Sequence, residues 1–350
     1  MSSSMQKNPE LLNSFIENSE NTKYNFLLTA ISYEERGFTS VKKIIENFSF
    51  TSVYLFSFGT RYLDEYLIKK WEKQKKDLAN FFKEKKIPYQ IIECNPILFK
   101  TTFEQIKDLS PPLIINITTF PKNYILKLAK EFDNPINIFI YSKSDYREPS
   151  IDELNSCVEN ILPIEGFEGT REISNEDMLV LILGYEGHRA LSFLSKFSPH
   201  KILPLIGIPR LGNIDEDEFY YKNVLRCNWN LLRKQSVIKN EWNYFFLISS
   251  LSHIDCYNEM SSIITEKIKE DHDLCISPLG TKPQTLGLYL FWRDHPETQI
   301  IYSIPVTRFD ITQLKTTQIS DVSKKEKNAL SNEIWVYSLP EKISTNKIKN

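Results

Sequence analysis

The chain has 350 residues, of which 41% are hydrophobic and 25% charged, so it is long enough to bury one large core or two ordinary ones. Its formal charge is -2, which gives no overall reason to expect a polyanion partner. A local basic patch stays open, so nucleic acid is neither required nor excluded. The first residues lack a signal-peptide pattern and no apolar run spans a membrane, so we expect a cytoplasmic protein without a membrane partner.

Cysteine spacing and known motifs argue against several classes of site. Five cysteines are scattered without a CxxC pair, which argues against a disulfide framework and a zinc-thiolate site. His253, Asp255 and Cys256 resemble metal ligands in type, but a helix would spread them over different faces, so no metal is expected. Walker A and GxGxxG loops are absent, and we expect no cofactor. The familiar hydrolase, kinase and deaminase signatures are absent as well.

The first half of the chain alternates short apolar runs with amphipathic stretches. The runs predict strands at residues 25–31, 52–58, 89–94, 113–118 and 137–142. The stretches between them predict helices at residues 39–48, 65–86, 99–109 and 123–132. Lysines between Lys69 and Lys86 are interleaved with acidic residues and predict a solvated helix face.

The second half repeats this plan. We predict strands at residues 178–184, 201–208, 273–279 and 299–306, and helices at residues 188–197 and 283–294. A long helical region from about Asp215 to Glu270 takes the place of the expected middle strand. The fold class predicted is α/β, with two tandem Rossmann-like lobes, each a mostly parallel sheet flanked by helices.

Composition divides the chain into five parts. Residues 1–22 are polar and predict a flexible tail, and the mixed, turn-rich residues 151–175 predict a connector. Lobe 1 is expected at residues 23–150 and lobe 2 at residues 176–314. The C-terminal extension, residues 315–350, is polar except for "EIWVYSLP", which could add one edge strand.

Two pairs of matching segments, the echoed segments, favour an internal duplication. Tyr-Glu-x-Arg follows the first strand of lobe 1, and Tyr-Glu-Gly-His-Arg follows that of lobe 2. Before the last helix, "NITTFPKN" in lobe 1 matches "SPLGTKPQ" in lobe 2. The alternative is that any two α/β lobes share this rhythm.

These echoed segments predict one crevice in each lobe. In sheets of this type the first and fourth strands are neighbours, and ligands bind beyond their carboxyl ends. In lobe 2, Gly280 permits a positive φ or close approach of a ligand, Thr281 supplies a hydroxyl and Lys282 a charge, which together predict an anion site at a helix N-terminus. An ordinary strand-to-helix turn is the alternative.

Further residues at the same rims complete the predicted sites. In lobe 2 they are Tyr185, Glu186, Arg189 and Arg210. In lobe 1 they are Glu34, Arg36, Thr118, Thr119 and Lys122. An arginine here could bind phosphate, or it could simply pair with the nearby glutamate. Glu186 and His188 are the weak candidates for a catalytic pair, so whether the protein is an enzyme stays open.

The lobe plan, the segment after each first strand and the loop "SPLGTKP" resemble the CRISPR-associated Rossmann-fold (CARF) domains of bacterial defence. The resemblance implies that Gly280, Thr281 and Lys282 contact a nucleotide backbone, and that two lobes enclose one cyclic oligonucleotide. It implies a sensor in anti-phage defence, working with a protein partner that carries the effector activity. Alternatives are a phosphodiesterase, ring nuclease or nucleoside N-glycosidase on the same scaffold, and purely structural loops. The oligomeric state, including a homodimer, stays open.

Overall fold

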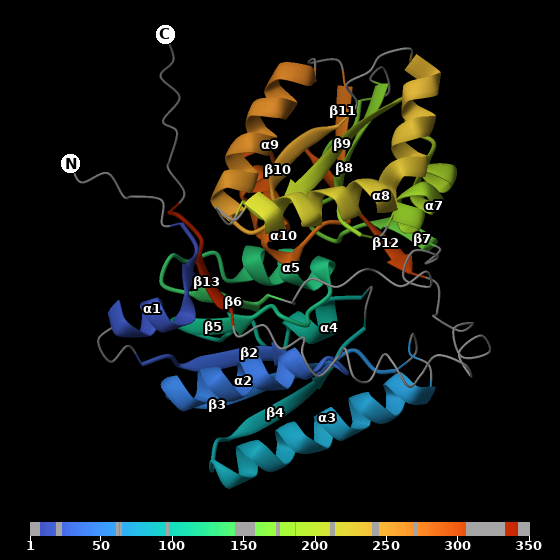
Figure 1. The fold of residues 1–350 in the computed structure, drawn as a ribbon. Helices are drawn as coiled ribbons and strands as arrows, with labels where there is room; N and C mark the ends of the chain where they lie inside the picture. The colour runs from blue at the N-terminus through green and yellow to red at the C-terminus, as the bar shows by residue number, and fades with distance from the viewer. Residues whose placement is uncertain are drawn as a thin grey trace.

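The computed structural model is an α/β protein with two mostly parallel sheets flanked by helices, as the sequence predicts (Figure 1). It describes residues 8–18, 23–60, 63, 65–95, 98–143, 158–172, 176–185, 187–210, 214–239, 245–268, 272–305 and 333–341.

Lobe 1 contains a seven-stranded sheet in the order β1-β13-β6-β5-β2-β3-β4. Its parallel strands are β2 (Phe26–Ala30), β3 (Ser52–Ser57), β4 (Tyr89–Glu93), β5 (Leu113–Asn116) and β6 (Ile138–Ser142). Its helices are α2 (Glu35–Asn47), α3 (Glu65–Glu84), α4 (Lys100–Phe103) and α5 (Lys122–Glu131). The central strands are buried on both faces, which explains why they read as continuous apolar runs.

Lobe 2 contains a six-stranded sheet in the order β10-β9-β8-β11-β12-β7. Its parallel strands are β8 (Glu176–Leu183), β9 (Lys201–Ile208), β10 (Phe246–Ser249), β11 (His272–Pro278) and β12 (Gln299–Pro305). Its helices are α7 (Gly187–Phe197), α8 (Ile214–Lys239), α9 (His253–Lys267) and α10 (Lys282–Asp294). None of the helices within the described ranges is long and apolar enough to cross a membrane.

Three segments differ from the sequence prediction. The long helical region predicted between Asp215 and Glu270 is two helices, α8 and α9. Between them lies β10, the middle strand that the sequence did not reveal. Part of the predicted N-terminal tail forms β1 (Glu10–Leu11) and α1 (Leu12–Asn18). Within the predicted connector, β7 (Val158–Pro163) pairs antiparallel with β12 and so joins the sheet of lobe 2.

The C-terminal strand belongs to lobe 1. β13 (Ile334–Ser338) lies between β6 and β1, antiparallel to both, so it is an inner strand and not the predicted edge. The chain therefore returns from lobe 2 to complete the first sheet, and both ends of the described chain meet there (Figure 1). Pairing three distant segments in one sheet ties the termini to the fold.

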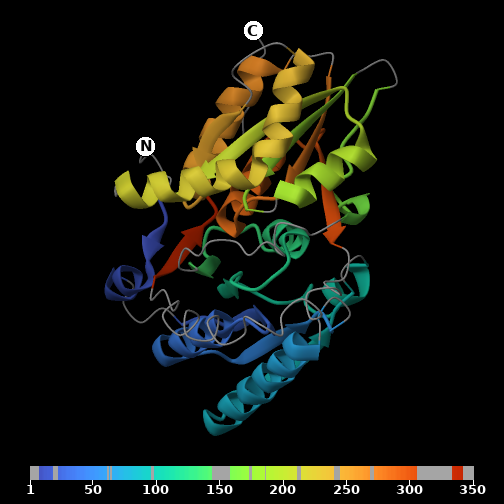
Figure 2. The same ribbon diagram turned by 45° about the vertical axis from the view of Figure 1, so that its right-hand side comes forward.

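The helix pair α5 and α10 joins the lobes. Each follows the fourth parallel strand of its lobe, and both lie between the two sheets (Figure 2). The largest buried cluster is continuous across this contact and includes Phe139 of lobe 1 and Leu290 of lobe 2. Asp133, just after α5, accepts hydrogen bonds from Tyr289 at 2.8 Å and Arg293 at 3.3 Å on α10. A shared core of this kind fixes the lobes relative to each other.

Candidate anion-binding site between the lobes

The strand order brings the echoed segments together within each lobe. β2 lies beside β5, and β8 lies beside β11, so in both lobes the first parallel strand neighbours the fourth, as predicted. The loops that follow these strands therefore leave the same edge of their sheet.

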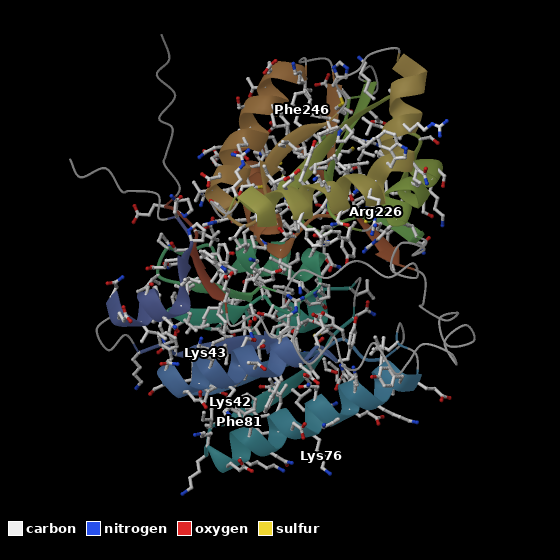
Figure 3. The ribbon with its side chains drawn as sticks, in the orientation of Figure 1. Lys42, Lys43, Lys76, Phe81, Arg226 and Phe246 are labelled. Carbon is white, nitrogen blue, oxygen red and sulfur yellow. The ribbon has the colours of Figure 1, made fainter. Side chains whose placement is uncertain are left out.

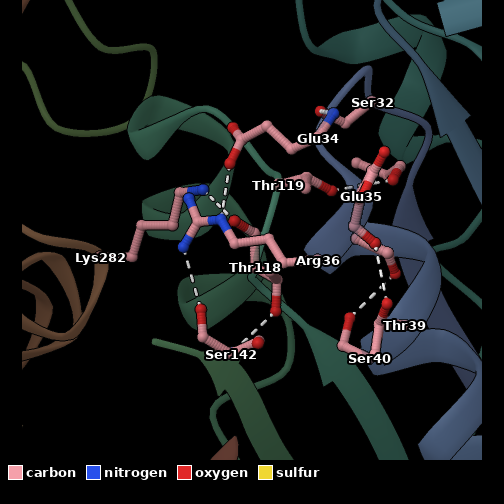
Figure 4. Close-up of polar contacts among 12 residues, drawn as sticks. Ser32, Glu34, Glu35, Arg36, Thr39, Ser40, Thr118, Thr119, Ser142 and Lys282 are labelled. Carbon is pink, nitrogen blue, oxygen red and sulfur yellow. Dashed lines mark hydrogen bonds and ion pairs between the residues drawn. The ribbon is translucent and has the colours of Figure 1, made fainter. Parts of the chain in front are cut away.

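Lys282 links the two lobes. It is the first residue of α10 in lobe 2, yet its ammonium group donates a hydrogen bond to the backbone carbonyl of Thr118 in lobe 1 (Figure 4). Arg36, Glu34 and Lys122 are close enough to act electrostatically on this ammonium. Cations from both lobes thus gather around the start of α5, and we call Glu34, Arg36, Lys122 and Lys282 the interlobe cluster.

The surroundings of Lys282 disfavour its positive charge. Burial is the main cause, and the positive charges of Arg36 and Lys122 add to it, while Glu34 partly offsets them. Together they lower the pKa of Lys282 from 10.5 to about 7. A bound anion would offset the positive charges around this ammonium group and so stabilise its charged form.

Arg36 is held in place on three sides. Its Nε donates to Glu34 at 2.6 Å, its terminal nitrogen donates to the Ser142 carbonyl at 2.9 Å, and its guanidinium lies 5.8 Å from the centre of the Tyr141 ring (Figure 4). Burial opposes the charge of Arg36, but Glu34 and Tyr141 outweigh burial and raise its pKa. Arg36 therefore stays charged, and it pairs with Glu34, which is the alternative to phosphate binding that the sequence left open.

The threonines after β5 hold the loop together. The Thr118 hydroxyl donates to Asn116 at 2.6 Å and accepts from the Ser142 N–H at 2.9 Å. The Thr119 hydroxyl donates to the Ala30 carbonyl at 2.9 Å. Both side chains thus have partners within lobe 1, and what Thr118 offers to Lys282 is its backbone oxygen.

The Gly-Thr-Lys loop is built largely around the cap of α10. Thr281 is the N-cap, and it forms a reciprocal capping box with Gln284, whose side chain accepts from the Thr281 N–H at 2.8 Å. Its hydroxyl also donates to the Ser250 carbonyl at 2.6 Å.

Gly280 is required by packing against this cap. Its φ is not positive, but a Cβ at this position would lie 2.2 Å from the Gln284 Oε1 and 2.8 Å from Ile182. Within the loop, the side chain that extends into the interlobe cluster is therefore Lys282.

The remaining predicted residues of lobe 2 lie elsewhere. Buried Arg189 donates from Nε to the Ser303 hydroxyl at 2.9 Å and from its terminal nitrogen to the Ser303 carbonyl. Arg210 pairs with Glu259 of α9. Tyr185 packs edge-on to Tyr220, 5.1 Å away. Glu186 and the side chain of His188, the weak catalytic candidates, lie outside the described residues.

Arg36 and Arg189 make the same contact in their two lobes. Each donates to the carbonyl of a serine on the fifth parallel strand, Ser142 or Ser303, and each lies over the ring of the preceding tyrosine. The sequence signal for this contact is Ile-Tyr-Ser, present at residues 140–142 and again at residues 301–303, a third match between the lobes beside the two predicted above.

Two helices begin at the interlobe cluster without a side-chain cap. Glu34 precedes α2 and Pro121 precedes α5, and neither side chain makes a capping hydrogen bond. Helix N-termini favour negative charge, and here they are joined by Arg36, Lys122 and Lys282. Within the described residues no group of histidine, cysteine and carboxylate side chains is arranged to hold a metal ion. The arrangement suits a phosphate or carboxylate.

The fold resembles that of a solved defence protein. The sequence matches no protein-family model, and no curated protein matches it either. Among solved structures, the chain is similar to a type III CRISPR defence DNA nuclease activated by cyclic oligoadenylate, with a TM-score of 0.53 and 8% identity. The alignment covers 79% of this chain and 65% of that one. At this identity the likeness establishes a shared two-lobed Rossmann-like fold.

A second solved structure aligns over a similar share of this chain but with a much lower TM-score. It is the cytoplasmic domain of a prokaryotic cation chloride cotransporter, at 9% identity and a TM-score of 0.26, over 81% of this chain and 96% of that one. A TM-score this low carries no argument about fold or function.

Proposed function

We propose that this protein is a nucleotide-binding sensor of a prokaryotic defence system, and that its ligand binds with a phosphate against the interlobe cluster. The observation that carries the proposal is that Lys282 of lobe 2 reaches the Thr118 carbonyl of lobe 1, beside Arg36 and Lys122. A ligand at this position contacts both lobes at once. The similar nuclease responds to cyclic oligoadenylate, so a cyclic oligonucleotide is the first ligand class to test.

An internal duplication fits this role. The matching contacts of Arg36 and Arg189 support an origin in two copies of one lobe, which a single chain keeps as a fixed pair. We propose that the effector activity resides in a separate protein partner. Helices α5 and α10, which pack against each other, begin at Lys122 and Lys282 of the cluster, and we propose that ligand binding there affects the packing of the lobes.

A thermal-shift and calorimetry series tests the proposal. The ligands are cyclic oligoadenylates of several ring sizes, linear oligoadenylates and inorganic phosphate, each added to wild type and to Lys282→Met. We expect saturable binding of at least one nucleotide by wild type and a loss of roughly tenfold or more in the variant, since a charge-assisted contact contributes about 1.5–3 kcal/mol. Lys42→Met is the matched control, because Lys42 is exposed on α2 and pairs with Glu46.

Two outcomes decide the question. No saturable binding of any nucleotide by wild type contradicts the proposal. Equal loss of binding in the Lys42 and Lys282 variants contradicts the assignment of the site. Chromatography after long incubation separates a sensor, which leaves the ligand intact, from an enzyme that cleaves it.

A further inference from the structure

Helix α8 has a sharp bend whose cause is local. Figures 1 and 2 show α8 as two limbs that meet at an angle over lobe 2, and Figure 3 labels Arg226 near the bend. The Asn228 amide donates to the Val224 carbonyl one turn back at 2.8 Å and to the Gly184 carbonyl at 2.7 Å, so it intrudes on the helix's own hydrogen bonds. The Cys227 carbonyl lies 1.8 Å from where a Cβ on Gly187 would stand, so only glycine fits at that contact.

The inner and outer sides of α8 are sharply different. Buried pairs recur every turn on the inner side, at residues 223 and 224, 227 and 228, and 231 and 232. The outer side carries five exposed residues at spacings of three or four, which we call the α8 stripe: Phe219, Lys222, Arg226, Trp229 and Arg233. The stripe runs along both limbs of α8, over roughly 20 Å measured along the helix axis.

The α8 stripe combines exposed aromatic side chains with cations. Trp229 is 60% exposed and Phe219 is 47% exposed, although aromatic side chains normally contribute to cores. Between and beyond them lie three cations, of which Lys222 pairs with Glu218 at 2.5 Å. The helix dipole does not account for these cations, because its effect is confined to the first and last turns of a helix, and it gives no reason to expose two aromatic rings.

We propose that the α8 stripe binds a single-stranded nucleic acid, with Phe219 and Trp229 stacking on bases and the three cations meeting phosphates. Proteins that bind single strands combine a positive track with aromatic platforms in this way. A protein interface is the other reading, because aromatic residues and arginine are enriched at interfaces, but the cores of interfaces are depleted of lysine and of charged residues as a whole. The overall charge of -2 is compatible with the proposal, because the stripe concentrates cations locally.

Fluorescence anisotropy with the full chain tests the proposal. The probes are labelled oligo-dT and oligo-rU of about 15 nucleotides, long enough to follow the stripe. We expect saturable binding near 50 mM salt, with a slope of log K against log salt of about −2 for three phosphate contacts. Trp229→Ala is expected to weaken binding roughly tenfold while Trp229→Phe retains most of it, because stacking needs an aromatic face. Arg226→Glu should also weaken binding and flatten the slope.

Two controls keep the test specific. Lys76→Glu makes the same charge change on the exposed side of α3 in lobe 1 and should leave binding unchanged (Figure 3). Lys282→Met should bind the strand like wild type, which separates this inference from the nucleotide site. Absence of saturable binding by wild type overturns the proposal, and so does equal weakening by the Trp229→Ala and Lys76→Glu variants. Self-association abolished by Trp229→Ala, without strand binding, would assign the stripe to a second copy of the chain.

Discussion

Replacing Lys282 by methionine separates a binding role from a structural one. The apolar side chain fills similar volume but carries no charge into the space beside Arg36. If the role of Lys282 is to bind an anion, its buried positive charge beside Arg36 and Lys122 lowers the stability of the unliganded protein. The variant should then be more stable than wild type while it loses nucleotide binding.

The magnitude of this gain follows from the pKa of Lys282. Its pKa is lowered from 10.5 to about 7, and each pKa unit corresponds to about 1.4 kcal/mol, so the upper limit is about 5 kcal/mol near pH 7. The partial exposure of Lys282 reduces this figure, and the lost hydrogen bond to Thr118 subtracts about 1 kcal/mol more. We therefore expect Lys282→Met to raise the free energy of unfolding by roughly 1–3 kcal/mol.

Urea unfolding at several pH values measures this effect. Between pH 7 and pH 10.5 the unfolded chain binds a proton at Lys282 that the folded chain has given up, so wild-type stability rises with pH relative to the variant. The advantage of the variant should be largest at and below about pH 7 and shrink toward pH 10. A variant that is less stable than wild type by more than about 1 kcal/mol would refute the reasoning and make Lys282 a structural tie between the lobes.

Three further predictions concern packing and the lobe contact. Gly280→Ala should destabilise the protein by roughly 1–3 kcal/mol in urea unfolding, because its Cβ would collide with the Gln284 side chain, and an unchanged midpoint would contradict that contact. Asp133→Ala should cost a similar amount, since it removes a carboxylate from the largely buried Arg293, and adding Arg293→Leu should recover part of the loss. Burial lowers the pKa of His253 to about 4, so the free energy of unfolding of the wild type should fall as pH drops from 6.5 toward 4. In His253→Phe this decline should be shallower. An equal decline in both proteins would contradict the idea that protonation of His253 causes it.

The sequence by itself determined the local elements and their order. Continuous apolar runs can be buried only between layers of helices, so they predicted a parallel sheet in each half. The α/β class followed from that pattern, whereas the neighbouring first and fourth strands were an expectation from the general rule for such sheets, which the strand pairing of the structure confirms. The missed strand β10 has only four residues, and periodicity alone does not distinguish so short an apolar run from a buried segment of a helix.

Only the tertiary structure decided which candidate residues meet. Lys282 and Arg36 are far apart in the chain, and the packing of α5 against α10 brings them into electrostatic contact. The same spacing pattern placed Arg189 beside Lys282, yet the Ser303 contact turns Arg189 toward β12. The periodicity of apolar residues in the sequence specifies which face of its own helix or strand a side chain occupies. The orientation of a long basic side chain also depends on hydrogen-bond acceptors that other elements supply.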